Sequence, residues 1–449
     1  MLVCALLAGA LQTAASAAPS STFTKMYPDK TELRVQLIGE GSGVLRVTVF
    51  PLGARTHNPY QDFLENVAPS TTGGLAVKTG AAGDTILSMT GGAFELAVAA
   101  NSPTTTLSVN GAVVSKETHA VQAVRGAACL PPGWLELDHI SGSSNGTMAA
   151  TRTGTTDDSC LRQARSLAPG EELYGFGQVP QDGLSAVGNT KLLATSSRNQ
   201  LDGPSHAPAP FYISVQGAGL AHGLMLNTAS YSSWDLGNRT KSEILIHSPD
   251  KYFDTFLFVG PTPAAVIAQM TSVSGRPPLP PLWALGFKYH TKNSVSQAFV
   301  EGIVSNFSAR GTPLAHVVIE NYFHSGEDLA VASFPNPAAM VSTIGSVRSG
   351  LSGGCKVVLW LDPHVHRSGT PLGDALVAAN CTSPQWQDSG GCGCSGPKMS
   401  AGCGQSMVWE PRCMAIWQAH VDKEFLSIGI GGFKLDQDDG DHGVGCASL

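Results

Sequence analysis

The sequence predicts a multidomain chain in which a β-sandwich precedes an α/β unit with a parallel sheet. Short strands separated by Gly, Asn, Asp and Ser turns fill residues 20–259 almost without a helix, which is typical of a sandwich. After a proline-rich stretch, apolar strands alternate with amphipathic helices. This alternation is typical of parallel strands buried on both faces. At 449 residues the chain is also too long for one ordinary domain.

The composition argues against several kinds of partner. Charged residues make up only 14% of the chain, and the net charge of -7 comes without any basic run. These features argue against nucleic acid and against an anionic membrane surface. No stretch beyond the N-terminus reaches the roughly 18 uncharged apolar residues that a membrane span needs, so we expect no span.

The N-terminus resembles a secretory signal. Leu2 to Leu11 is short and rich in Ala and Leu, and Ala15-Ser-Ala17 supplies a small-x-small cleavage site. We therefore expect residues 1–17 to be a signal peptide cut before Ala18, and the protein to be secreted or in the lumen of the secretory pathway. A buried N-terminal helix is the alternative, since no Lys or Arg precedes the apolar run.

The cysteines and sequons agree with an oxidising compartment. Five of the ten cysteines fall in a Gly/Ser-rich insertion, residues 381–413, which we expect to lack strands and to be held by disulfides. Zinc is the competing interpretation, but Cys392-x-Cys394 lacks the usual C-x2-C pairs. Beyond Cys4 the count is nine, which leaves one thiol without a partner in the chain. Four N-x-S/T sequons predict glycosylation at Asn145, Asn238, Asn306 and Asn380.

We expect the N-terminal sandwich to occupy residues 18–260. Its predicted strands are 33–38, 43–50, 94–99, 106–109, 112–114, 211–215, 223–226, 242–247 and 252–259. Asn110-Gly111 between two of them predicts a tight hairpin turn.

Residues 261–281 are expected to connect the two domains. Pro261 to Val273 predicts a helix with Pro263 in its first turn, and Arg276-Pro-Pro-Leu-Pro-Pro281 predicts a stiff extended connector.

The second domain is expected to occupy residues 282–449. Its predicted strands are 283–287, 314–319, 356–361 and one that ends at Asp436. The predicted helices are 294–309, 337–349 and 416–425, the first of them with Ser294 as a cap and with Phe299, Ile303 and Phe307 on one face.

Three of these strands are each followed by an acid. Glu320, Asp362 and Asp436 follow apolar strands directly. Because the carboxyl ends of parallel strands meet at one rim, these acids are predicted to lie near one another, where a (β/α)8 barrel carries its chemistry. An acid that only caps the loop after a buried strand is the plain alternative for Asp436.

Several short motifs resemble glycoside hydrolase family 31, the α-glucosidase and α-xylosidase family. In chain order they are Glu172-Leu-Tyr-Gly-Phe-Gly-Gln178, Pro280-Pro-Leu-Trp-Ala-Leu-Gly-Phe287, Arg310-Gly-Thr-Pro-Leu314, Phe334-Pro-Asn-Pro337, Leu359-Trp-Leu-Asp-Pro363 and Gly432-Phe-Lys-Leu-Asp436. The resemblance implies a galactose-mutarotase-like sandwich followed by the first half of a (β/α)8 TIM barrel.

The resemblance also implies roles for individual residues. Asp436 matches the catalytic nucleophile, and Glu320 matches a sugar-binding acid that is usually Asp. Trp360 and Asp362 match the rim of the third strand, and Lys434 matches a lysine typical of the branch that includes α-xylosidases. Core packing is the alternative for Trp360. His364 and His366, just after this strand, are expected to be solvated loop residues rather than ligands.

The expected function is that of a retaining glycosidase that cleaves terminal α-linked glucose or xylose from oligosaccharides. Such an enzyme needs two carboxyl groups about 5 to 5.5 Å apart, and Asp436 would be the one that attacks. In the family the general acid lies on a later segment, for which this chain has no candidate. With about four barrel strands, we expect a chain truncated after the nucleophile strand and of doubtful activity.

Two other functions remain open at this point. One is a non-catalytic secreted carbohydrate-binding glycoprotein, and the other is a structural or interaction role. No cofactor and no metal are expected. The acidic run after Asp436 is not an EF-hand, because Gly440 is fifth and Ala447 twelfth, where an EF-hand loop needs Gly sixth and Glu twelfth.

Overall fold

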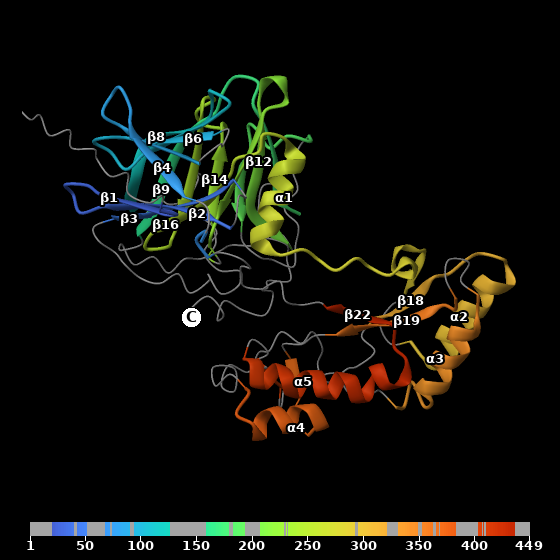
Figure 1. Ribbon diagram of the computed structural model, residues 1–449. Helices are drawn as coiled ribbons and strands as arrows, with labels where there is room; N and C mark the ends of the chain where they lie inside the picture. The colour runs from blue at the N-terminus through green and yellow to red at the C-terminus, as the bar shows by residue number, and fades with distance from the viewer. Residues whose placement is uncertain are drawn as a thin grey trace, which may run out of the picture.

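A computed structural model of the chain describes most of both predicted domains (Figure 1). The described residues are 20–39, 43–51, 68–71, 74–89, 94–125, 159–178, 183–193, 207–228, 230, 232–291, 295–320, 331–348, 353–361, 365–367, 369–382, 403–405, 407 and 410–435. The predicted signal peptide and Asn145 lie outside these residues, as do Asp362, His364 and Asp436.

The first sheet of the N-terminal part has seven antiparallel strands. In spatial order they are β1 (Thr22–Met26), β2 (Glu32–Ile38), β3 (Val44–Phe50), β16 (Phe253–Phe258), β13 (Ala221–Leu226), β12 (Pro208–Val215) and β10 (Glu172–Gly177). A short 3-10 helix, η4 (Gly217–Gly219), joins β12 to β13.

The second sheet has nine antiparallel strands. In spatial order they are β11 (Thr190–Leu193), β14 (Ser232–Leu236), β15 (Glu243–Ser248), β9 (Ser159–Ser166), β8 (Ala112–Arg125), β7 (Thr105–Val109), β6 (Phe94–Val98), β5 (Thr85–Met89) and β4 (Leu75–Thr79). Asn110 and Gly111 have φ values of 51° and 82°, so the hairpin predicted between β7 and β8 is confirmed as a turn with two left-handed residues.

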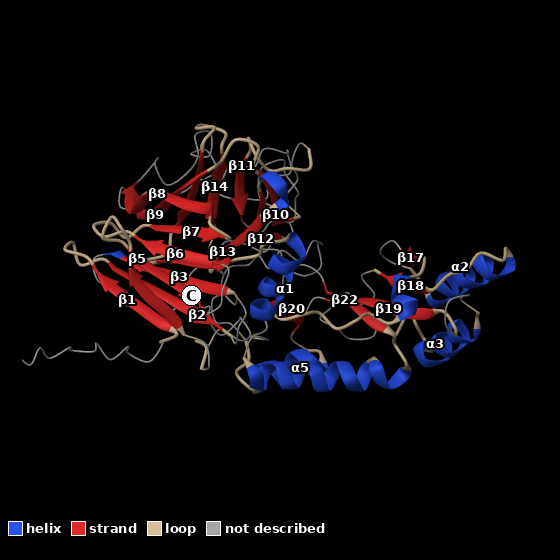
Figure 2. Ribbon diagram, turned by 45° about the horizontal axis from the view of Figure 1, so that its top comes forward, coloured by secondary structure: helices blue, strands red, loops and turns tan. Residues whose placement is uncertain are grey.

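The apolar core lies between the two sheets (Figure 2). Alternate residues of β6 and β7 are buried, because successive side chains of a strand point to opposite faces. Trp234 of one sheet meets Tyr212 and Phe176 of the other, with ring centroids 6.1 and 5.5 Å away. Full burial of each such side chain stabilises the fold by roughly 1.5–3 kcal/mol.

Helix α1 (Pro263–Ser274) covers the outer face of the seven-stranded sheet. It begins at Pro263, two residues after the predicted start, because the Thr262 hydroxyl accepts a hydrogen bond from the Ala265 amide at 3.2 Å and Pro263 fits the first turn. Val266 and Val273 pack against Phe256 and Phe258 of β16.

The C-terminal part is built on a four-stranded parallel sheet, in the order β17-β18-β19-β22. Its strands are β17 (Lys288–His290), β18 (His316–Ile319), β19 (Lys356–Leu361) and β22 (Gly432–Leu435), and the helices between them are α2 (Gln297–Ala309), α3 (Pro337–Ser346), α4 (Pro371–Ala378) and α5 (Pro411–Glu424). The parallel pairing and the alternation with helices are as predicted.

Helices α2, α3 and α5 cover one face of this sheet (Figure 1). Their buried side chains pack on Val317 and Ile319 of β18 and on Val357 and Leu359 of β19. The helix starts are capped, since Ser296 and Asn336 accept hydrogen bonds from the amides of Phe299 and Ala339.

Two predictions about this part were wrong. Residues 283–287 do not form the first strand. A 3-10 helix, η5 (Leu282–Leu285), stands there and the strand starts at residue 288. Helix α2 begins after Ser296 and not Ser294, and it buries Val300 and Val304 while Phe299 is 46% exposed. The predicted face is therefore only partly correct, since Phe307 packs against the core beside Tyr289 of β17, whereas the fully buried side chains of the helix are Val300 and Val304.

The cysteine-rich insertion contains more regular structure than predicted. Strand β21 (Cys403–Gln405) pairs with β20 (Val365–Arg367), so the insertion is not strandless. Cys413 lies in α5 and forms a disulfide with Cys381. Cys160 is disulfide-bonded as well, whereas Cys355 is a free thiol buried under α3.

Another 3-10 helix, η7 (Leu426–Ile428), follows α5 and leads to β22. Among the described residues, every helix is too short or too polar to cross a bilayer.

Candidate active site

The two faces of the four-stranded sheet carry different side chains. Ile319 and Leu359 are register partners, as are Leu359 and Phe433, and all three belong to the core under the helices. Since side chains alternate along a strand, the next residues point to the opposite face, called here the inner face. At the carboxyl ends of their strands these residues are Glu320, Trp360 and Lys434.

Glu320 and Lys434 meet on the inner face. The Lys434 ammonium lies 3.3 Å from each Glu320 carboxylate oxygen. The lysine reaches from β22 past β19 to the end of β18. The Glu320 side chain is 19% exposed and that of Lys434 is 37% exposed, so the pair is accessible to a ligand.

His290 is the third member of this group, and sequence reasoning did not find it. Its Nε2 contacts Glu320 Oε2. His290 is the last residue of β17 and is in register with Val318, two residues before Glu320, so all three side chains point to the inner face. The available signal was a histidine at the end of the first strand, but that strand was predicted to start five residues too early and to end before His290.

The backbone at Glu320 is fixed by a neighbouring strand. The Glu320 amide donates to Thr291 Oγ1 at 3.0 Å, and the Thr291 amide donates to the Val318 carbonyl at 2.9 Å. Thr291 is buried. These bonds hold the start of the Glu320 side chain beside β17.

Trp360 lies on the inner face in register with Lys434 and is 8% exposed. Core packing and a place at the site are both compatible with this low exposure. The indole packs within the sheet layer, and it also lies beside the Glu320–Lys434 pair.

Another aromatic side chain covers the amino-terminal end of the inner face. The Trp283 ring packs edge-on against His316 with centroids 5.4 Å apart, and it also approaches Gly432. Burial lowers the pKa of His316, so the imidazole is neutral near pH 7. The polar groups of the inner face are therefore concentrated at its carboxyl end.

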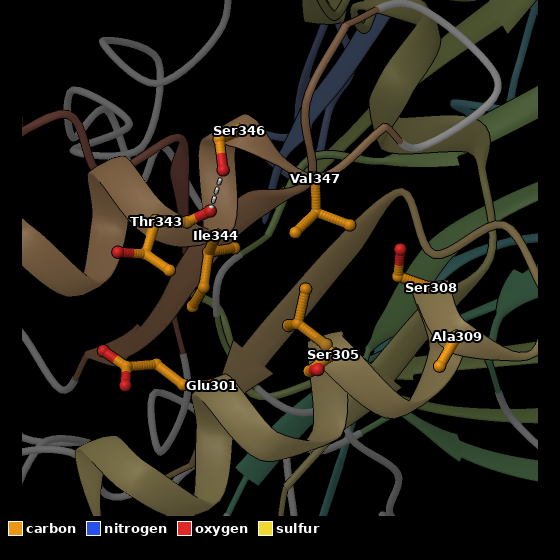
Figure 3. Close-up of a pocket in the computed structure, with 9 residues that line it drawn as sticks. Glu301, Ser305, Ser308, Ala309, Thr343, Ile344, Ser346 and Val347 are labelled. Atoms are coloured by element: carbon orange, nitrogen blue, oxygen red, sulfur yellow. Dashed lines mark hydrogen bonds between the residues drawn. The ribbon is translucent and has the colours of Figure 1, made fainter.

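A separate pocket lies between α2 and α3 on the helical side of the sheet (Figure 3). Its volume is about 340 Å³, and its polar lining comprises Glu301, Ser305, Ser308, Thr343 and Ser346. The Ser346 hydroxyl donates to the Thr343 carbonyl at 2.6 Å. One carboxylate among hydroxyls is not the pair of carboxyl groups that glycoside hydrolysis needs.

Of the predicted site residues, the structure brings Glu320, Lys434 and Trp360 together. Asp362 and Asp436 lie outside the described residues, directly after β19 and β22 in sequence. Among the predicted glycosylation sites, Asn238, Asn306 and Asn380 are exposed. The arrangement places the Glu320 carboxylate between an ammonium and an imidazole on the inner face of the sheet.

Comparison with known proteins places this site in a family context. Residues 277–446 match the family model described as the TIM-barrel domain of glycosyl hydrolases family 31. Alpha-glucosidase 2 of Bacillus thermoamyloliquefaciens is 26% identical over 203 residues, covering 43% of this chain and 24% of that protein. Alpha-xylosidase XylQ of Lactiplantibacillus pentosus is 23% identical over 292 residues, covering 62% of this chain and 35% of that protein.

Solved structures share the fold. A dextranase of this family from Flavobacterium johnsoniae, solved with glucose, superposes with a TM-score of 0.72 at 16% identity. The superposition covers 93% of this chain and 47% of the dextranase chain. The chain thus spans between about a quarter and a half of the length of these three proteins.

Proposed function

Because the chain belongs to glycoside hydrolase family 31, we propose that the protein is a retaining glycosidase acting on terminal α-linked glucose or xylose. The observation that supports this proposal is the Glu320–Lys434 pair with Trp360 beside it at the carboxyl ends of parallel strands. Barrel enzymes carry their chemistry at that end of the sheet.

In the proposed reaction Asp436 is the nucleophile. Its carboxylate oxygen bonds to the anomeric carbon as the bond to the leaving oxygen breaks, and water then hydrolyses the glycosyl-enzyme ester. Asp436 follows Leu435, the last residue of β22, and stands two residues after Lys434. A cation on the same side of the strand favours an ionised, attacking carboxylate.

The glycone is proposed to bind to Glu320, Trp360, Asp362 and Lys434. Carboxylates accept hydrogen bonds from sugar hydroxyls, and the lysine donates to them. The flat indole of Trp360 offers an apolar surface against a sugar ring.

The proposal extends to the whole molecule. We infer that the two antiparallel sheets form a sandwich of the galactose-mutarotase type, and that the parallel sheet is the first half of a (β/α)8 barrel. The exposed sequons at Asn238, Asn306 and Asn380 and the Cys381–Cys413 disulfide support a secreted glycoprotein.

The reaction is testable with α-D-glucosyl fluoride and α-D-xylosyl fluoride. Fluoride leaves without being protonated, so the test does not depend on a general acid. We expect the chain to release fluoride from at least one of the two substrates, and Asp436→Asn to lower the rate at least about a thousandfold.

Two controls make the result specific to Asp436. Asp438→Asn changes a carboxylate two residues further along the chain and is expected to keep the wild-type rate. A 5-fluoro glycosyl fluoride, whose ester breaks down slowly, is expected to add one sugar to the peptide that contains Asp436. Binding of glucose or xylose without any fluoride release would favour a non-catalytic sugar-binding protein.

A further inference from the structure

We propose that His290 is a positioning residue that orients the Glu320 carboxylate toward the glycone. The inference rests on the proposed function and adds to it a residue that the sequence motifs do not include. It depends on the contact between His290 Nε2 and Glu320 Oε2 and on the strand geometry that brings the two side chains together.

The direction of the hydrogen bond follows from the chemistry of the pair. An ionised carboxylate only accepts hydrogen bonds, so Nε2–H of His290 is the donor. Lys434 donates to Glu320 from the opposite side, at 3.3 Å from each oxygen. The carboxylate is thereby held between β17 and β22, at the two edges of the four-stranded sheet.

His290 and Lys434 occupy most of the hydrogen-bond acceptor sites of the Glu320 carboxylate. A carboxylate has about four lone-pair sites, two on each oxygen. Lys434 uses one on each oxygen, and His290 uses the second on Oε2. Among the contacts that the described residues make, Oε1 keeps one site, and we infer that Glu320 accepts there from a hydroxyl of the glycone, in a direction that His290 and Lys434 fix jointly.

The length of the Glu320 side chain allows its contact with His290. An aspartate at position 320 would be one methylene shorter than the glutamate. The backbone of Glu320 is tied to Thr291, so the shorter side chain would start from the same place and fall short of His290. We infer that His290 stabilises the longer side chain in one rotamer.

Kinetics with the glycosyl fluoride that the wild-type chain hydrolyses test the role of His290. We expect His290→Ala and Glu320→Asp each to lower kcat/KM about 10- to 100-fold, mainly through a higher KM. His290→Gln places an amide donor close to the position of Nε2 and is expected to stay within about threefold of wild type. Lys288→Ala, two residues earlier on the same strand, is the matched control and is expected to keep wild-type kinetics.

The double variant separates positioning from a merely structural contribution. If His290 acts through Glu320, His290→Ala with Glu320→Asp is no worse than either single variant. Losses that multiply, a His290→Ala variant with wild-type KM, or no rescue by His290→Gln would overturn the inference.

A measurement without substrate distinguishes this inference from the proposed function. The ¹⁵N shift of His290 Nε2 is expected to change when Glu320 becomes Gln, whether or not the chain turns over substrate. Absence of fluoride release by the wild-type chain counts against the proposed function. An unchanged ¹⁵N shift counts against the His290–Glu320 bond and so against this inference alone.

Discussion

At the residue scale, the glycines of the Tyr174-Gly-Phe-Gly-Gln178 turn have a structural reason to be glycine. Gly175 and Gly177 have φ values of 139° and 72°, and a Cβ on either would lie within 2.4 Å of a carbonyl oxygen of the segment that carries β12. The register of β10 against β12 shifts between these two residues. The motif that signals the family therefore also fixes a bulge at the edge of the seven-stranded sheet.

Gly177→Ala is expected to destabilise the protein by more than the 1–3 kcal/mol that a left-handed non-glycine residue costs. The added Cβ would stand 2.1 Å from the Ala207 carbonyl oxygen, so the paired strands would have to separate. Thermal unfolding followed by circular dichroism measures the effect.

Gly170→Ala is the matched control for that substitution. Gly170 has a φ of 75°, but no atom lies within 4 Å of the place that a Cβ would occupy, so only the backbone penalty applies. Equal losses in the two variants would show that the contact with Ala207 does not matter.

At the element scale, a disulfide joins the two ends of the cysteine insertion, one of them just after α4 and the other in α5. Cys381 follows α4, and Cys413 lies in the first turn of α5, with a separation of 32 in sequence. Both cysteines are buried against Leu372 and Leu376 of α4. The disulfide is therefore part of the contact between α4 and α5.

Removing this crosslink by Cys381→Ser with Cys413→Ser is expected to lower the free energy of unfolding by about 3–4 kcal/mol. The reason is that the unfolded chain gains conformational entropy when a loop of this length is no longer closed. Hydrogen exchange of the α4 and α5 amides in urea measures the change. Cys355→Ala, which removes a thiol without opening a crosslink, is the control. Protection of α4 and α5 equal to wild type in the double variant would contradict the prediction.

The elements themselves show how far sequence reasoning reaches. The strand at 356–361 was placed correctly because five consecutive apolar residues, Val357 to Leu361, are typical of a strand buried on both faces. The first strand of the parallel sheet was misplaced because Trp283 and Phe287 are as apolar as any strand residue. The structure uses Trp283 to cover the inner face and leaves Phe287 exposed.

The candidate site was predicted only as far as local sequence allows. Glu320 and Lys434 each stand at or directly after the end of an apolar strand, which a pattern detects. The contact with His290 joins residues 30 positions apart and depends on the register of β17 against β18. No periodicity within one strand carries that information.

At the scale of the whole molecule, the sandwich contains buried titratable groups that link its stability to pH. Burial lowers the pKa of His222 to about 3 and that of His247 to about 4. Their Nδ1 atoms have no hydrogen-bond partner among the described residues. Both imidazoles are therefore neutral in the folded protein near pH 7.

Acid is expected to destabilise the fold through these histidines. An unfolded histidine binds a proton near pH 6.5, whereas folded His247 does so near pH 4. The unfolded chain thus holds more protons between these values, and stability is full above about pH 6.5 and falls as the pH drops toward 4. For His247 alone the loss is on the order of 3 kcal/mol.

Urea unfolding of the wild type and of His247→Gln at several pH values checks this expectation. Gln cannot be protonated, so the difference in the free energy of unfolding between the two proteins should change between pH 7 and pH 4.5. A constant difference across this range would mean that His247 does not titrate with unfolding.

The rate at which the buried Cys355 thiol is alkylated reports how often the parallel sheet opens. Burial raises the pKa of this thiol to about 11, so almost no reactive thiolate is present at neutral pH. Cys355 immediately precedes β19, the strand that carries Trp360. An alkylating reagent gains access to this sulfur only when α3 and β19 part, so the rate of its modification records how often the sheet beneath the proposed sugar site opens.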